Sequence, residues 1–233
     1  MSQPTILGFD TSGHHCAAAL LCGDNQIAAV QEDMAKGQAE RLMPLLQELM
    51  DQEGFSWADL DAIAVGIGPG NFTGIRIGVS AARGLALGLG IPAIGVSSFE
   101  LLRGPNSVAD HRPQLVSLPA PRGTNFLQLF KDGHAVAAPD HVTVSADGLA
   151  DYQLEAGIDI IGDNVLGLWS LLSKTPQDAQ PAGLERDIEQ IPATLVKIAS
   201  DKFAKGTMSA PAPLYVRAAD AAPPRDAPPV ILP

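Results

Sequence analysis

The chain has 233 residues, and 46% of them are hydrophobic, which is enough to form one or two buried cores. No stretch is long and apolar enough to cross a bilayer, and residues 1–4 lead into an apolar run instead of a signal sequence, so we expect a cytoplasmic protein without a membrane partner. The formal net charge of −11 and the aromatic content of 5% argue against direct binding of a nucleic-acid backbone or of unpaired bases.

The first hundred residues have the pattern of an α/β half-domain. Short strands are predicted at 5–9, 16–22 and 26–31, followed by a helix at 38–50, a buried strand at 60–67, a helix at 71–89 and a strand at 92–96. Turn signals separate the first three strands, at Ser12-Gly13 and at Gly23-Asp24-Asn25. A meander followed by alternating helices and strands predicts a mixed sheet covered by helices.

The helix at 38–50 has an unusually wide apolar face. Its apolar side chains are Leu42, Met43, Leu45, Leu46, Leu49 and Met50. They cover about 160° of the helix, more than the ~100° needed to cover one core. We therefore expect part of this face to remain exposed and to bind a second protein or a second copy. Pro44 lies in this run, so the helix either begins near it or kinks there.

Residues 68–78 form the most specific stretch of the chain, Gly-Pro-Gly-Asn-Phe-Thr-Gly-Ile-Arg-Ile-Gly. The glycines predict a sharp turn between a buried strand and a helix, and Asn71 is suited to cap that helix. Such a turn can bind an anion, but the Lys-Ser/Thr ending of a P-loop and the spacing of a dinucleotide fingerprint are both missing.

The helix at 71–89 has two neighbouring stripes. One is apolar, with Phe72, Ile75, Val79, Ala82, Ala86 and Leu89, and the other is small, with Gly74, Gly78, Ala81 and Gly88. Each interior glycine costs ~1 kcal/mol relative to alanine, and close approach of another backbone would offset that cost. That backbone belongs either to a partner or to the chain's own sheet or neighbouring helix. The predicted partner interface comprises Leu42, Leu45, Leu46, Leu49, Phe72, Gly74, Ile75, Gly78, Ala81, Ala82 and Leu85.

Three motifs resemble the TsaB (YeaZ) family, a glycoprotease-like family of tRNA threonylcarbamoyladenosine biosynthesis. They are Ile6-Leu7-Gly8-Phe9-Asp10-Thr11-Ser12, residues 68–78, and Pro213-Leu214-Tyr215-Val216-Arg217. The resemblance is strong over residues 1–100 and thin from there to about 210. It implies an actin-like ATPase-domain (ribonuclease H-like) fold with two lobes, each with a mixed five-stranded-type sheet flanked by helices.

The same resemblance implies a non-catalytic subunit without independent activity. Such a subunit binds the catalytic subunit TsaD, with the ATPase TsaE joining them. Separately, the exposed patch on the two helices can pair with its own copy, so we expect a homodimer when the chain is alone. No tightly bound cofactor is expected, because ATP and metal would sit on the partner subunits. Contact with tRNA would be indirect.

The second half of the chain is less regular. Ser97 and Glu100 form a capping box that opens another helix, and residues 104–113 mark a boundary. Strands at 114–118, 125–130 and 158–161, a hairpin turn at 131–133 and a helix at 193–204 follow. We therefore divide the chain into an N-terminal lobe with the partner-binding helices at 1–103, a degenerate C-terminal lobe at 104–217 and an Ala/Pro-rich tail at 218–233.

Two alternative functions remain open. A sugar-kinase-like ATPase would use a vestigial nucleotide site made of Asp10, Thr11, Ser12, Gly68 and Gly70, although no Lys or Arg lies near in sequence and Asp10 can instead cap its turn. A metallopeptidase needs two histidines at helical spacing with a carboxylate. The five histidines, His14, His15, His111, His134 and His141, include no such pair. We assign no catalytic and no metal-binding residue.

Overall fold

The computed structural model describes residues 4–23, 26–105, 113–150, 152, 158–172, 190–208 and 210–216. The tail at 218–233, Arg217, His111 and most of the 104–113 boundary lie outside these ranges. The first strands and helices are β1 (Ile6–Asp10), β2 (His15–Cys22), β3 (Gln26–Asp33), α1 (Gln38–Glu53), β4 (Ala62–Gly66), α2 (Phe72–Leu89), β5 (Ala93–Val96) and α3 (Ser98–Arg103). The others are β6 (Gln114–Ala120), β7 (Thr124–Lys131), β8 (His134–Ala135), β9 (Asp140–Val142), β10 (Asp159–Gly162), α4 (Val165–Leu172) and α5 (Ile191–Lys205).

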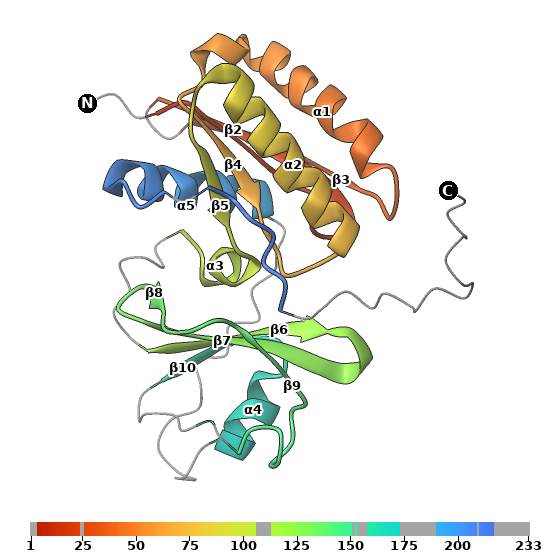
Figure 1. Cartoon of the computed structure of the whole chain (residues 1–233), viewed down its shortest axis with the longest axis vertical. Coiled ribbons are helices and arrows are strands. Elements are labelled where there is room, and N and C mark those ends of the chain that lie inside the picture. The colour runs from red at the N-terminus through yellow and green to blue at the C-terminus, as the bar shows by residue number, and fades with distance from the viewer. Residues whose placement is uncertain are drawn as a thin grey trace, which may run out of the picture.

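The first sheet has the strand order β3-β2-β1-β4-β5 (Figure 1). β2 runs antiparallel to both β1 and β3, whereas β4 runs parallel to both β1 and β5. This is the predicted meander followed by a parallel half. Leu7 shows the register at the centre of the sheet, because it lies opposite Leu20 of β2 and Ile63 of β4.

Helices cover both faces of this sheet. Leu7 and Phe9 of β1 join the core under α1 and α2, whereas Ile6 joins the core on the opposite face, under α5. A Cβ at Gly8 would lie 2.5 Å from Val196 of α5, so the missing side chain allows α5 to pack directly on β1. α5 lies in the range that we assigned to the second lobe, yet it packs on the first sheet (Figure 1). The proposed division at residue 104 stays a prediction.

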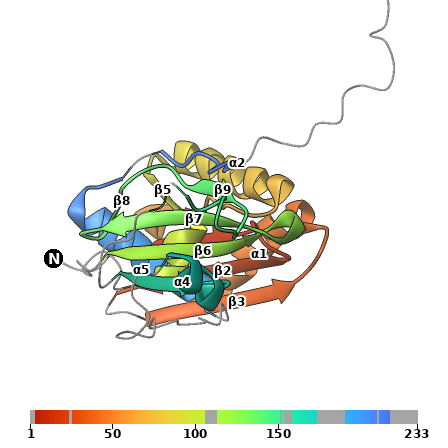
Figure 2. The same cartoon turned by 90° about the horizontal axis from the view of Figure 1, so that it is seen from below.

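The second sheet has the order β10-β6-β7-β8, with β9 also paired to β7. β10 runs parallel to β6, and the other pairs are antiparallel. α4 packs on one face, and Phe99 and Leu102 of α3 pack on the other (Figures 1 and 2). Two mixed five-stranded sheets flanked by helices confirm the predicted fold class, the actin-like ATPase-domain type.

Pro44 lies inside α1, which begins earlier, at Gln38, so the alternative in which the helix starts near the proline is wrong. Every helix in the described ranges falls short of the length and apolarity that a bilayer span requires.

Asn71 caps α2 as predicted. Its side-chain oxygen Oδ1 accepts a hydrogen bond from the backbone N–H of Gly74 at 2.9 Å. Replacing Asn71 by alanine should lower the free energy of unfolding by about 1 kcal/mol, because one N–H of the first turn loses its acceptor. Urea denaturation measures this loss. Asn71→Asp should keep most of the stability, and an equal loss in both variants would show that the cap is not responsible.

The two cysteines should differ in reactivity. Cys16 is buried in β2, where desolvation and then the nearby Glu32 carboxylate raise the pKa of its thiol to about 11. Cys22, at the end of the same strand, is half-buried, and desolvation raises its thiol pKa as well. At pH 8 a thiol of pKa 11 is ionised in only about one molecule in a thousand, and a buried thiolate is out of reach of a reagent.

We therefore expect a thiol-disulfide reagent to modify Cys22 in the native chain and Cys16 only after unfolding. Absorbance with Ellman's reagent at pH 8 counts the reacting thiols. Cys22→Ser should abolish the native signal; if Cys16→Ser abolishes it instead, the assignment of the two thiols is reversed.

Candidate functional site

The glycine turn holds the start of α2 against the end of β1. Gly68 has φ +84°, a conformation in which a side chain is strained. The backbone N–H of Asn71 donates to the carbonyl of Ser12 at 2.6 Å. A Cβ at Gly70 would lie 2.3 Å from that same Ser12 oxygen. The turn needs glycine because two backbone segments of one chain meet there.

The glycines of α2 are explained in the same way. The hydroxyl of Thr11 donates to the carbonyl of Gly74 at 2.7 Å, and a Cβ at Gly74 would lie 1.9 Å from the Thr11 carbonyl oxygen. A Cβ at Gly78 would lie 2.9 Å from Thr11 Oγ1 and 3.3 Å from Val65 Cγ2. The close neighbours of these glycines are the end of β1 and the sheet of the same chain. This is the second of the two predicted explanations, in which the approaching backbone belongs to the chain itself and not to a partner.

The predicted partner interface stays a prediction, but most of its residues face the interior of the chain. Eight of its residues are buried within this chain: Leu42, Leu45, Leu46, Leu49, Gly74, Ile75, Gly78 and Ala82. They cannot contact a partner while α1 and α2 stay packed. The wide apolar face of α1 arises because this helix packs in a common core with both the first sheet and α2. Phe72, Ala81 and Leu85 remain partly accessible.

The outward side of α1 is mostly ionic. Nη2 of Arg41 lies 2.6 Å from Glu32 Oε1 and 2.7 Å from Glu48 Oε2. The hydrogen bonds from Arg41 lower the pKa of both carboxyl groups. Met43, 42% exposed, is the large apolar side chain that α1 leaves in solvent. Little of the expected surplus apolar area of α1 is present.

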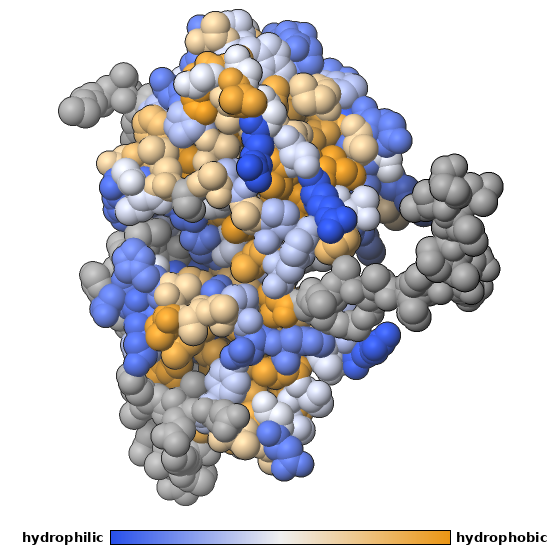
Figure 3. Space-filling model, in the orientation of Figure 1, coloured by the Kyte–Doolittle hydropathy of each residue, from blue (hydrophilic) through white to orange (hydrophobic). Residues whose placement is uncertain are grey.

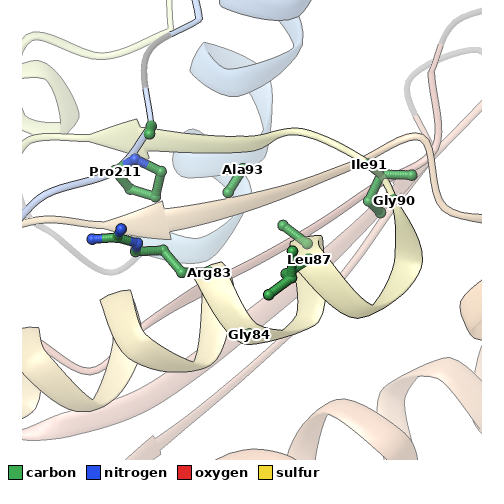
Figure 4. Close-up of a pocket in the computed structure, with 9 residues that line it drawn as sticks. Arg83, Gly84, Leu87, Gly90, Ile91, Ala93 and Pro211 are labelled. Atoms are coloured by element: carbon green, nitrogen blue, oxygen red, sulfur yellow. The ribbon is translucent and has the colours of Figure 1, made fainter.

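α2, in contrast, leaves an apolar surface open on its C-terminal half. Leu87 is 86% exposed, and a Cβ at Gly84 or at Gly88 would meet no heavy atom within 4 Å. We call Gly84, Leu87 and Gly88 the outer face of α2. It borders a groove of about 560 Å³ that Arg83, Ala93 and Pro211 also line (Figure 4).

Figure 3 shows apolar surface around α2 interrupted by strongly hydrophilic side chains. We did not predict Leu87 as a contact residue. The sequence does contain a signal for its exposure: Leu87 lies outside the apolar stripe of its own helix, so the fold is not expected to bury it.

The segment after α5 runs back along α2 as an extended strap, residues 210–216 (Figure 1). The N–H of Leu214 donates to the carbonyl of Ile67 at 2.9 Å. Arg76 Nε donates to the Tyr215 hydroxyl at 2.8 Å, and its guanidinium lies 3.8 Å from the centre of the Phe72 ring. Arg76 is thus bound within the chain, whereas Arg83 lines the groove.

The residues of the predicted nucleotide site do lie together, at the ends of β1 and β4. Asp10, Ser12 and Gly70 line a cavity of about 280 Å³ between the two sheets. The hydroxyl of Thr11 is directed to α2 instead, and the carbonyl of Gly68 accepts from the N–H of Ser98 at 2.9 Å. Among the lining residues that the structure describes there is no lysine or arginine. The described lining therefore offers a phosphate no lysine or arginine for a charge-assisted hydrogen bond.

Asp10 lines this cavity together with His15 and is 1% exposed. Its Oδ1 accepts from the backbone N–H of Ser12 at 2.6 Å, so it caps its own turn as the alternative reading held, and from His15 Nε2 at 3.3 Å. His14 is exposed. Among the described residues, no group of three or more His, Cys, Asp or Glu side chains is placed to hold a metal ion.

Known proteins are similar to this chain in sequence and in fold. The sequence model of the family TsaD, tRNA N6-adenosine threonylcarbamoyltransferase, matches residues 27–146. The tRNA threonylcarbamoyladenosine biosynthesis protein TsaB of Escherichia coli is 42% identical over 94 residues, which are 40% of each chain. TsaB of Bacillus subtilis is 35% identical over 150 residues, 62% of this chain and 64% of the relative. These matches therefore span only part of the length of the curated relatives.

A crystal structure from Pseudomonas aeruginosa, described as an uncharacterized protein with similarity to peptidase YEAZ, has 25% identity and a TM-score of 0.68. It covers 92% of this chain and 100% of its own. Together with the two-sheet architecture, these matches define a glycoprotease-like protein of the actin-like fold. The chain belongs to the TsaB (YeaZ) family.

Proposed function

We propose that this chain is a non-catalytic subunit of the machinery that makes threonylcarbamoyladenosine in tRNA, and that it binds the catalytic subunit TsaD in the cytoplasm. The observation that carries this proposal is the match of its sequence to proteins named TsaB. Because those matches cover 40% and 64% of the relatives, the role itself is our inference.

The outer face of α2 is the surface we assign to TsaD. It combines an exposed leucine with two open glycines, so a partner helix can approach the α2 backbone closely. Phe72, Ala81 and Leu85 of the same helix stay partly accessible and can extend the contact. This moves the interface from the buried side of the helix pair to its solvent side.

The partner's own family supports this choice. The family model that matches residues 27–146 describes the transferase itself, so this chain and the enzyme are related over a region that holds α1 and α2. Two related subunits can pair through equivalent helices in a near two-fold arrangement. The same surface can then pair two copies of this chain when the partner is missing, which gives the proposed homodimer.

The chemistry is assigned to the partners. Within the described part of the chain, no lysine or arginine lines the interlobe cavity, which supports the placement of ATP and metal on TsaD and TsaE. The net charge of −11 supports a tRNA contact made by other subunits, because binding of nucleic acid depends on neutralising phosphates.

Reconstitution tests the proposal. The purified full chain is mixed with TsaD from the same organism and analysed by size-exclusion chromatography, and threonylcarbamoyl transfer to tRNA is measured with TsaE and ATP, with and without the chain. We expect a stable complex and transfer only when the chain is present. Full transfer without the chain, or transfer by the chain alone, contradicts the proposed role.

A further inference from the structure

The interlobe cavity has the features of a binding site that is separate from the outer face of α2. Both lobes build its walls: Asp10 and Ser12 come from the end of β1, and Leu118 and Phe126 come from β6 and β7. Its volume of about 280 Å³ is near the lower end of the range typical of small-molecule pockets, about 300–1,000 Å³. A ligand there would contact both sheets at once.

One wall of the cavity is acidic and incompletely hydrogen-bonded. Asp10 Oδ1 has two donors, whereas Oδ2 packs against Gly66 of β4, where an added Cβ would lie 1.9 Å from it, and receives no hydrogen bond from any residue that the structure describes. A buried carboxylate oxygen without a donor carries an unfavourable desolvation cost. A ligand that supplies a charged N–H donor would remove this cost, and a charge-assisted hydrogen bond is the stronger kind.

Another part of the wall is apolar. Leu101, Leu118, Phe126 and Ile191 line it, from both lobes and the start of α5. The lining that the structure describes includes no lysine or arginine, and the imidazole of His15 lies 3.3 Å from Asp10 itself, so a carboxylate or phosphate ligand would meet the negative charge of Asp10. The ligand class that fits this lining has an apolar body and a positively charged nitrogen.

We propose that this cavity binds a small primary amine with an apolar body, held by its ammonium group at Asp10 and by its body against Leu118, Phe126 and Ile191. Ligand binding then ties the two lobes together. This proposal differs from the vestigial nucleotide site predicted from the sequence, because the proposed ligand is a cation whereas a nucleotide is an anion.

Methyl-labelled full chain and three matched probes test the proposal by NMR: benzylamine, benzyl alcohol and benzoate. We expect benzylamine to shift the methyl signals of Leu118 and Ile191 while the exposed Leu87 stays unchanged. Benzoate should bind at least about tenfold more weakly, because its charge repels Asp10. Equal binding of benzylamine and benzoate, or no shift with benzylamine, overturns the proposal.

Two further measurements keep the result specific. Asp10→Asn should weaken benzylamine about tenfold, because a charged acceptor is lost, whereas the exposed control Asp147→Asn should not. If Asp10→Asn does not fold, the comparison of amine and carboxylate on the unaltered chain still decides. Magnesium ATP is the remaining probe: shifts of the same methyl groups by ATP would make the cavity a nucleotide site and the proposal wrong.

Discussion

Replacing Gly74 by alanine is expected to lower the free energy of unfolding by about 3 kcal/mol or more, at the upper end of what one added methyl group costs in a packed interior. The new Cβ would lie 1.9 Å from the carbonyl oxygen of Thr11, which is backbone and cannot swing aside. To accommodate it, α2 must move away from β1, and the buried hydrogen bond from the Thr11 hydroxyl to the Gly74 carbonyl is strained or lost.

Gly84→Ala is the matched control on the same helix. A Cβ at Gly84 meets no heavy atom within 4 Å, so the added methyl group should stabilise the chain by up to about 1 kcal/mol through helix propensity. Urea denaturation of both variants gives the comparison. Equal effects at the two positions would mean that α2 does not pack on β1 as described.

Leu87→Asp is expected to weaken binding of TsaD about 100-fold, which corresponds to about 2.7 kcal/mol. If a partner covers the outer face of α2, the aspartate becomes a buried charge without a counterion, and such groups are among the most costly in an interface. The lone chain should keep its stability within about 0.5 kcal/mol, because Leu87 is 86% exposed.

Leu166→Asp is the control for this experiment. Leu166 lies on α4 of the second lobe and is 76% exposed, so the substitution is the same in chemistry and similar in exposure. Calorimetric titration with purified TsaD should give wild-type affinity for Leu166→Asp. A large loss in both variants, or in neither, would show that the outer face of α2 is not the specific contact surface.

A bulky residue in place of Gly78 would be a misleading test of the predicted interface. Gly78 was predicted to contact a partner, but a bulky residue there meets Thr11 and Val65 of the same chain. Loss of binding in such a variant would report a damaged fold. Only exposed positions such as Leu87 separate binding from folding.

The amino-acid sequence by itself determined the elements whose causes are local. The capping oxygen of Asn71 lies three residues from the N–H it binds, and the Ser97–Glu100 capping box is confirmed for the same reason. The bounds predicted from strand and helix periodicity lie close to the observed bounds of β1 to β5, α1 and α2. These signals depend on neighbours within one turn or one strand, so no knowledge of the rest of the chain is needed.

Only the tertiary structure decided which neighbour each face meets. A stripe of glycines indicates that another segment approaches the helix closely, but the sequence does not show which segment it is. In the structure, Thr11 is that neighbour for both Gly74 and Gly78. In the same way α5 packs on the first sheet instead of the second, and Leu87 stays exposed while Leu46 is buried. Apolar periodicity shows which side of a helix is apolar. Which segment packs against that side depends on contacts between parts of the chain that are far apart in sequence.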